Sequence, residues 1–246
     1  MKHMRKLSLL LCVALLASMV LTGCGPKEKP APPNEAAEAI FMIAIKNDAA
    51  KAMEVFGFAS ESDAKKELMG SDEDPYKEVG EQLVAQFEAM GANVSSEDAQ
   101  ALIDAVLSML GKLQYSAEVK DIDEKAGTAV VTSHIGHYDS VAIQDAMTQA
   151  MTEVSTDPNL DAMTQAMTEV STDPNLDVND QDAFYSAIIQ KVAEVMSSIQ
   201  PVEGTKDFDT DFQLVKAEVS GKEKQVWIPV DANAFGADLS NAAMGG

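Results

Sequence analysis

The hydrophobic pattern of this chain alternates between a helical period and a period of two, and that order constrains the fold more than any other feature. Apolar residues recur at three-to-four spacing in residues 35–56, 75–90 and 95–110, which predicts amphipathic helices. Residues 113–120 then alternate apolar and polar side chains, as in a strand with one buried face. A turn at residues 123–127 leads to a second strand through Val130, Val131 and Ile135, so the two strands are predicted to form an antiparallel hairpin.

The same order is then repeated. A helical region is predicted over residues 141–200, ended by Pro201, and a second hairpin joins strands at 208–219 and 225–230 through a turn at 220–223. Helices, hairpin, helices, hairpin is the order of an α+β fold. We expect helices packed on one face of a four-stranded antiparallel sheet made of the two hairpins.

Several residues mark where the helices are expected to begin and end. Asn47-Asp48 provides a break and a cap, and Ser95 with Asp98 forms a variant of the capping box before the helix that Gly111 ends. A short helix is expected over residues 231–240. Trp227, the sole tryptophan, lies on the last strand, where packing in the sheet is the expected role.

The first 23 residues have the composition of a secretory signal peptide. Lys2, Arg5 and Lys6 precede an uncharged, mostly apolar run at residues 7–20 that is short for a membrane span. The segment ends in Leu-Thr-Gly-Cys at residues 21–24. An ordinary signal peptide, or an anchor helix with a chance cysteine, is the alternative interpretation.

Residues 21–24 resemble the lipobox of bacterial lipoproteins. In that family the signal is cut before the cysteine, whose sulfur receives diacylglycerol, so the resemblance implies lipidation of Cys24. It implies attachment to the outer face of a bacterial cell membrane, most readily a Gram-positive one, with the bilayer as a partner. Residues 24–34 carry four prolines and predict an extended tether of roughly 30 Å. A single domain is then expected over residues 35–246.

The charge and cysteine content exclude several classes of function. The formal net charge is −22, and the one arginine, Arg5, lies in the signal segment. Such a surface repels phosphodiester backbones, so no nucleic acid partner is expected. Basic partners or divalent cations are the natural counterparts, although acidity that serves solubility alone explains the composition as well. The only other cysteine, Cys12, lies in the signal segment, so the mature chain is expected to have no disulfide.

Residues 145–160 are repeated without a change as residues 161–176. Two copies are too few for a solenoid, and their identity indicates a recent tandem duplication. We expect a tolerated insertion in a surface connection between helices. The alternative is a methionine-lined docking surface for another protein.

Deletion of residues 161–176 is expected to leave the thermal unfolding temperature nearly unchanged, because one copy would lie outside the core. Differential scanning calorimetry of the deletion variant measures this. Loss of cooperative unfolding in that variant would contradict the interpretation.

Two groups of acidic residues are candidates for binding a cation. Asp207, Asp209 and Asp211 alternate with apolar or small residues and are expected to line the solvent-facing side of a strand. Residues 173–179 have the alternating oxygen ligands of the first half of a calcium loop. Val178 stands where that loop needs glycine, and Phe184 where it needs the bidentate glutamate, so a helix-capping loop is the better interpretation.

His137, Tyr138 and Asp139 are the candidates for chemistry in a cavity. His134 and His137 are three residues apart on a strand and point to opposite faces, so they do not readily share a metal ion. His137 and Asp139 share a face and are compatible with a general base and the residue that orients it. The sequence contains no G-x-S-x-G, H-E-x-x-H or phosphate-binding glycine motif to accompany them, and no cofactor is predicted.

The whole mature chain resembles a group of uncharacterised bacterial lipoproteins that carry a domain of unknown function. The resemblance rests on the Leu-Thr-Gly-Cys box with its proline tether, on residues 44–52, on the Tyr-Ser-Ala-Glu-Val-Lys-Asp hairpin, and on Val-Trp-Ile at residues 226–228. It implies a layout similar to the cystatin-like or nuclear-transport-factor-like roll. The group has no catalytic residues to carry over, and the identical repeat departs from its pattern.

These observations predict a membrane-anchored, extracytoplasmic lipoprotein that acts as a non-catalytic binding or interaction module. The alternative is a small-ligand carrier or small enzyme that uses a cavity between the sheet and the helices. Polar side chains that converge inside such a cavity would favour the alternative.

Overall fold

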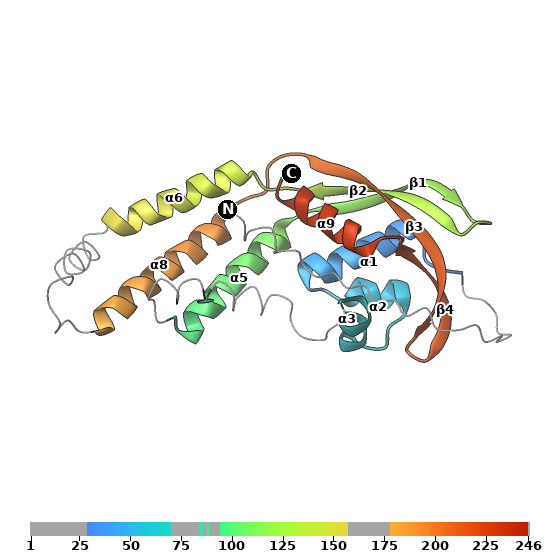
Figure 1. Ribbon diagram of the computed structural model, residues 1–246, viewed down its shortest axis with the longest axis horizontal. Helices are drawn as coiled ribbons and strands as arrows, with labels where there is room; N and C mark the ends of the chain where they lie inside the picture. The colour runs from blue at the N-terminus through green and yellow to red at the C-terminus, as the bar shows by residue number, and fades with distance from the viewer. Residues whose placement is uncertain (1–28, 70–83, 86–87, 89–93, 157–177, 246) are drawn as a thin grey trace. The chain divides into compact units, whose positions relative to one another are not determined.

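The computed structural model describes residues 29–69, 84–85, 88, 94–156 and 178–245 (Figure 1). Cys24, most of the predicted helix at 75–90 and the second copy of the repeat lie outside these residues. The chain divides into two compact units. The first unit draws on Met1–Glu73, Leu113–His137 and Val202–Gly246, and the second on Asp74–Lys112 and Tyr138–Pro201. The prediction of a single domain over residues 35–246 stays a prediction.

The first unit contains the sheet. Its strands run in the order β1-β2-β3-β4, and each neighbouring pair is antiparallel. The predicted α+β class and the sheet of two hairpins are confirmed. The strands are β1 (Tyr115–Asp123), β2 (Thr128–Gly136), β3 (Thr205–Val219) and β4 (Lys222–Pro229); the helices of this unit are α1 (Pro33–Lys46), α2 (Ala50–Phe56), α3 (Glu61–Met69) and α9 (Ala232–Ala243).

Both hairpins turn where the sequence has glycine. Between β1 and β2, Asp123 Oδ1 accepts hydrogen bonds from the backbone N–H groups of Lys125 and Ala126, and Gly127 has a φ of 68°. Between β3 and β4 the turn is only Ser220-Gly221, with φ values of 50° and 75°. Two residues of positive φ match the twist of the strands. Lys222 and Glu223 therefore belong to β4, so the predicted turn at 220–223 was two residues too long.

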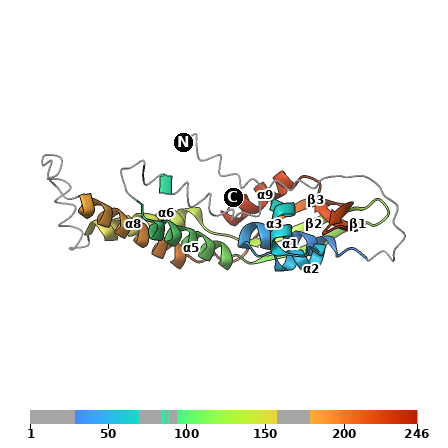
Figure 2. The same ribbon diagram turned by 90° about the horizontal axis from the view of Figure 1, so that it is seen from below.

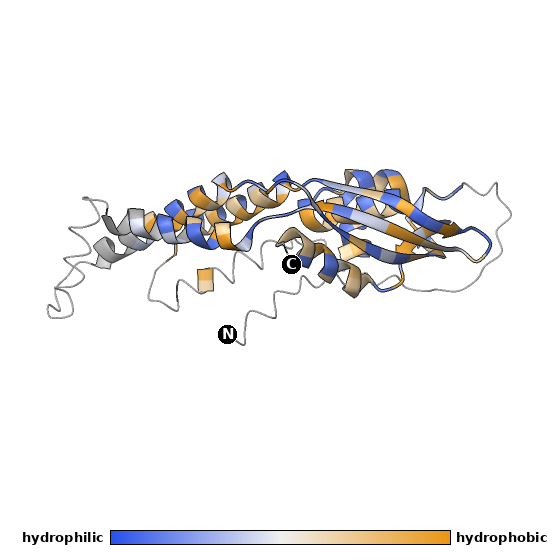
Figure 3. Ribbon diagram, turned by 90° about the horizontal axis from the view of Figure 1, so that it is seen from above, coloured by the Kyte–Doolittle hydropathy of each residue, from blue (hydrophilic) through white to orange (hydrophobic). Residues whose placement is uncertain are grey.

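One face of the sheet is covered by α1 and α9. Along β2, the side chains of Ala129, Val131, Ser133 and Ile135 are buried, and Figure 3 shows hydrophobic and hydrophilic residues alternating along the strands. Tyr115, which pairs with Ile135, stacks on Phe41 of α1 with ring centroids 4.3 Å apart. For α1 and α9 the predicted packing of helices on one face is confirmed.

The aromatic contacts of α9 lie on this same face. Phe208 and Phe212 of β3, which pair with Ser133 and Ala129, lie 6.0 and 5.9 Å from the ring of Phe235. The layout similar to the cystatin-like roll stays a prediction. Trp227 on β4 is only 4% exposed, as its predicted packing role requires.

The ends of α1 are tied to neighbouring parts of the first unit. At its start, Asn34 Nδ2 donates to the carbonyl oxygen of Ala117 on the edge strand β1, at 3.5 Å. At its end, Asn47 is left-handed with a φ of 54°, and the N–H of Asp48 donates to the carbonyl of Met42. This hydrogen bond gives a partner to a carbonyl near the end of the helix, where the last carbonyls have none within it. Asp48 Oδ1 then accepts from the N–H of Ala50 at the start of α2, so the predicted break and cap are confirmed.

The described part of the second unit includes helices α5 (Ser96–Lys112), α6 (Ser140–Thr156) and α8 (Val178–Ser198), which run beside one another (Figures 1 and 2). Its core forms between α5 and α8, and α6 packs on α8. The predicted helix end at Gly111 lies one residue early. The core residues are Leu102, Ala105, Ile188, Ile189, Val192 and Ala193.

Lysine and tyrosine side chains satisfy carbonyl groups at two helix ends of this unit. Lys112 Nζ donates to the carbonyls of Ser197 and Ile199, where α8 ends. Tyr138 Oη donates to the carbonyl of Met109, in the last turn of α5. The last four carbonyls of a helix have no partner within it, so these side chains replace partners that the backbone does not supply.

A buried carboxylate joins α5 to α8. Asp98 is 2% exposed; its Oδ2 accepts from Ser95 Oγ at 2.7 Å and its Oδ1 from Ser186 Oγ at 2.8 Å. Ser95 Oγ also accepts from the N–H of Asp98, so the predicted cap at Ser95 is confirmed. Burial would raise the pKa of Asp98, but hydrogen bonds from Ser95, Ser186 and Gln190 outweigh it and hold the pKa below the ordinary 3.8. Asp98 is therefore both the cap of one helix and the link to the other.

Replacement Asp98→Ala is expected to lower the free energy of unfolding of the helical unit by about 2–3 kcal/mol, because buried hydroxyl donors lose a charged acceptor. Urea unfolding followed by helical circular dichroism at pH 7 measures the loss. The exposed Asp104 on the same helix is the matched control, and Asp104→Asn should change the free energy by less than about 0.5 kcal/mol.

The pH dependence of this effect has a definite sign. Because the pKa of Asp98 is lower in the folded state, its stabilisation is complete above the ordinary value of 3.8 and is lost as the pH falls below that value. The difference between the wild type and Asp98→Asn should therefore shrink on acidification. A difference that stays constant from pH 7 to pH 3 would contradict this role.

Candidate functional site

The face of the sheet opposite α1 and α9 carries polar side chains arranged in rows across β1, β2 and β3. We call it the outer face. The register sets the rows, because β2 lies between the other two strands and each of its outward residues pairs on both sides. From one end of β2 to the other the rows are Ser116–His134–Asp207, Glu118–Thr132–Asp209, Asp121–Val130–Asp211 and Asp123–Thr128–Gln213. Asp207, Asp209 and Asp211 are all exposed, as the alternation along the strand predicts.

The first row is centred on His134. Its Nδ1 lies 2.8 Å from Asp207 Oδ1, and its Nε2 lies 3.8 Å from Glu118 Oε1. Thr205 Oγ1 also donates to Asp207 Oδ1. The hydrogen bonds from His134 and Thr205 hold the pKa of Asp207 below its ordinary value. His134 thus joins carboxylates of β1 and β3 across β2.

The second row is centred on Asp209. Thr132 Oγ1 donates to Asp209 Oδ1 at 2.7 Å, and Lys120 Nζ donates to Asp209 Oδ2. The register of β1 shifts between Val119 and Asp121, which makes Lys120 the extra residue of a β-bulge. The hydrogen bonds from Lys120 and Thr132 hold the pKa of Asp209 below its ordinary value. In this row the carboxylate of Asp209 has the ammonium group of Lys120 as its cationic partner.

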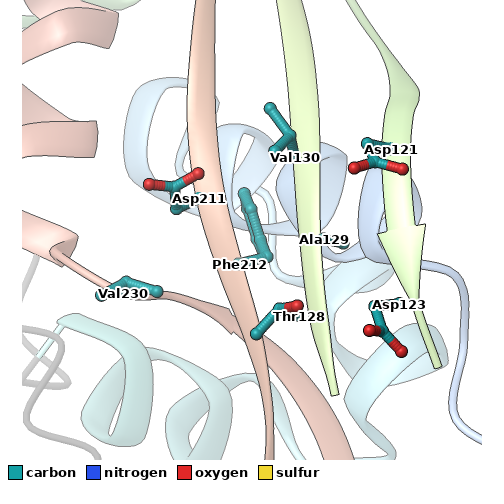
Figure 4. A pocket seen from close by; sticks show the side chains of 8 residues that line it. All are labelled: Asp121, Asp123, Thr128, Ala129, Val130, Asp211, Phe212 and Val230. Carbon is teal, nitrogen blue, oxygen red and sulfur yellow. The ribbon is translucent and has the colours of Figure 1, made fainter. Parts of the chain in front are cut away.

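The third row has no such cation. Asp121 on β1 and Asp211 on β3 stand on either side of Val130 (Figure 4). Asp121 Oδ1 accepts a hydrogen bond from the following N–H, of Ile122. Among the residues that the structure describes, neither aspartate has an ion pair.

A hollow of about 310 Å³ lies at this row and the next. The backbone N–H of Val230 donates to the carbonyl of Asp211, which holds this valine at the hollow, where it is 57% exposed. The hollow therefore combines three carboxylates with the apolar surface of two valines. It is lined by Asp121, Asp123, Thr128, Ala129, Val130, Asp211, Phe212 and Val230 (Figure 4).

The predicted cation candidates are spread along β3 and do not gather at one point. Alternate residues of a strand are about 6.6–6.8 Å apart, and Asp207 and Asp209 already have His134 and Lys120 as partners. In the described part of the chain, no group of three or more histidine, cysteine, aspartate or glutamate residues is placed to hold a metal ion. The calcium-loop candidate at 173–179 lies mostly outside the described residues.

Two of the three predicted cavity residues take part in local structure. Tyr138 is buried, its hydroxyl donates to the carbonyl of Met109 at 2.5 Å, and burial raises its pKa. Asp139 is exposed, and its Oδ1 accepts from the N–H of Val141 at the start of α6. Tyr138 and Asp139 thus serve a helix end and a helix start.

His137 is half-buried at the end of β2. Its backbone carbonyl accepts from the N–H of Val202, and its buried Nδ1 has no hydrogen-bond partner within the described residues. The pairing of His137 with Asp139 as base and orienting residue stays a prediction.

Sequence reasoning missed the part that Asp121, Asp123 and His134 play in the outer face. For the first two a signal existed, since the turn predicted at 123–127 fixes which residues of the two strands oppose one another. For His134 there was none, because its partner Asp207 lies on a strand far along the chain.

Comparisons with known proteins identify no family. No family model matches the chain, and no curated protein matches it. A solved structure from Bacillus subtilis, described as "a putative lipoprotein (ycdA)", is similar with 14% sequence identity and a TM-score of 0.49. The alignment covers 86% of this chain and 56% of that one, so this chain spans little more than half of its length. No helix in the described residues is long and apolar enough to cross a membrane.

Replacement Tyr138→Phe tests whether this residue is structural. Loss of its hydrogen bond to the Met109 carbonyl should lower the free energy of unfolding by about 1 kcal/mol, and Tyr138→Leu, which also loses ring contacts, should cost more. Urea unfolding of both variants measures the two effects. If Tyr138→Phe is as stable as the wild type, the hydroxyl is not a structural group and the cavity hypothesis regains weight.

Proposed function

We propose that this protein is a lipoprotein of the extracytoplasmic membrane face, anchored through acylated Cys24, and that its folded part is a binding module without catalysis. The observation that carries the proposal is the agreement of three parts of the N-terminal segment. These are the basic residues, the apolar run at 7–20 and the Leu-Thr-Gly-Cys box at 21–24. Each is required in the type of signal that ends at a lipidated cysteine.

The start of the folded part supports a short tether. Helix α1 begins at Pro33, after residues 25–32, of which three are proline. At about 3 Å per residue, an extended segment of this length spans roughly 25 Å. That distance is enough to hold the first unit clear of lipid headgroups and too short to let it move far from the membrane.

The contacts of two of the residues predicted to carry chemistry, Tyr138 and Asp139, support binding over catalysis. Tyr138 and Asp139 make hydrogen bonds to backbone groups at helix ends, which are structural contacts. The exposed outer face of the sheet, by contrast, offers several strands' side chains to a partner at once. A protein partner is the counterpart that such a surface suits.

The anchor is tested by Cys24→Ala. The variant should leave the membrane fraction and lose incorporation of a labelled fatty acid, because no other mature residue offers a thiol. Membrane fractionation with metabolic fatty-acid labelling measures both. The matched control is Cys12→Ala, which removes the other cysteine of the chain and should keep both membrane retention and label. Unchanged retention of Cys24→Ala without label would show an uncleaved helix instead of a lipid anchor.

A further inference from the structure

The outer face of the sheet is acidic, and some of its carboxylates have a basic side chain as partner while others have none among the described residues. The carboxylates of Asp207 and Asp209 each have a basic side chain as partner, His134 and Lys120 respectively. Asp121 and Asp211 have none within the described residues. The rows at the end of the face where the hollow lies are therefore the ones whose aspartates have no basic partner among the described residues, and we call them the unbalanced rows.

The geometry of the unbalanced row fits an ammonium or guanidinium group on an apolar stem. Neighbouring strands lie about 4.8 Å apart, so the backbones of Asp121 and Asp211 are separated by roughly 10 Å with Val130 between them. A long cationic side chain can lay its methylene groups on Val130 and Val230 and place its charge between the two carboxylates. A bare metal ion needs six or more oxygen atoms at about 2.4 Å, which two aspartates at this separation do not supply.

The spacing of the rows fits a polypeptide in extended form. Asp121 and Asp123 point to the same side of β1 and are separated by about 6.8 Å. An extended segment places the side chains of residues i and i+2 at the same spacing. Lysine or arginine at alternate positions therefore brings one charge to each acidic row.

We propose that the outer face, at the hollow between Asp121, Asp123 and Asp211, docks an extended basic segment of a partner protein. The inference rests on the proposed function as a binding module and adds the chemistry of the partner. Charge complementarity in the unbalanced rows selects the basic side chains. The neutral, narrow residues of β2, Thr128 and Val130, leave room for the segment between the carboxylates.

The test uses the full-length lipidated protein in uncharged detergent, titrated by calorimetry with an eight-residue peptide of alternating lysine and valine. A peptide of alternating serine and valine is the control ligand. The proposal expects binding of the lysine peptide only, weakened by added salt. The double variant Asp121→Asn/Asp211→Asn should weaken it about tenfold, as expected for the loss of two exposed ion pairs.

The control variant removes the same charge elsewhere in the same unit. Asp63 and Glu67 are exposed on α3, and Asp63→Asn/Glu67→Gln should change the affinity less than about twofold. An equal loss in both double variants would show non-specific attraction to an acidic protein and overturn the proposal. The absence of any heat with the lysine peptide would also overturn it. So would a result in which the protein binds calcium at millimolar concentration, loses this binding in Asp121→Asn/Asp211→Asn, and does not bind the peptide.

The same samples separate this inference from the proposed function. Membrane retention and fatty-acid labelling of the double variant report on the anchor alone. If they persist while the peptide fails to bind, the docking proposal is wrong and the anchored module stands. If the wild type itself is neither labelled nor retained, the anchor is wrong whatever the peptide does.

Discussion

The burial of α1 against the sheet is the constraint on which the first unit depends. Ile40, Phe41, Ile43 and Ala44 are almost fully buried, because the helix contacts β1, β2 and β4 on one side and α2 on the other. The stack of Phe41 on Tyr115 fixes its position along the strands, and Tyr115 in turn bonds to Ser133. Since that helix occupies the inner face together with α9, the opposite face is the one on which the strands keep their polar residues.

Local patterns in the sequence were enough to predict most of this fold. Alternation gave the strands, glycine gave the turns, and Asn47, Ser95 and Asp231 mark helix ends where they were expected. Helix α3 was not predicted, because its sequence is polar and only Ala64 and Leu68 are buried. The separation into two units was not predicted either, since it depends on the packing of α5 with α8 through residues far apart in the chain.

For the candidate site too, features that depend on neighbouring residues could be predicted, whereas contacts between strands far apart in the chain could not. The exposure of Asp207, Asp209 and Asp211 follows from the alternation of inward and outward side chains along a strand alone. Which of them has a basic side chain as partner depends on the pairing of β2 with β3 and on the bulge at Lys120, and neither can be recognised from the neighbouring residues in the sequence. Tyr138 illustrates the same limit: its position beside a histidine and an aspartate suggested chemistry, and nothing in the sequence indicated that its hydroxyl bonds to the backbone of a helix that precedes it by many residues.

The hydrogen bond of Asn34 to Ala117 connects the start of α1 to the edge strand of the sheet. The residues that follow the proposed anchor lead directly into the buried helix α1, whose start is hydrogen-bonded to the edge strand β1. Any mechanical load between the membrane and a docked partner would therefore run through α1 and the sheet, along elements that share one core. A pull on this connection would thus act on the buried side chains of α1, which belong to the core of the first unit.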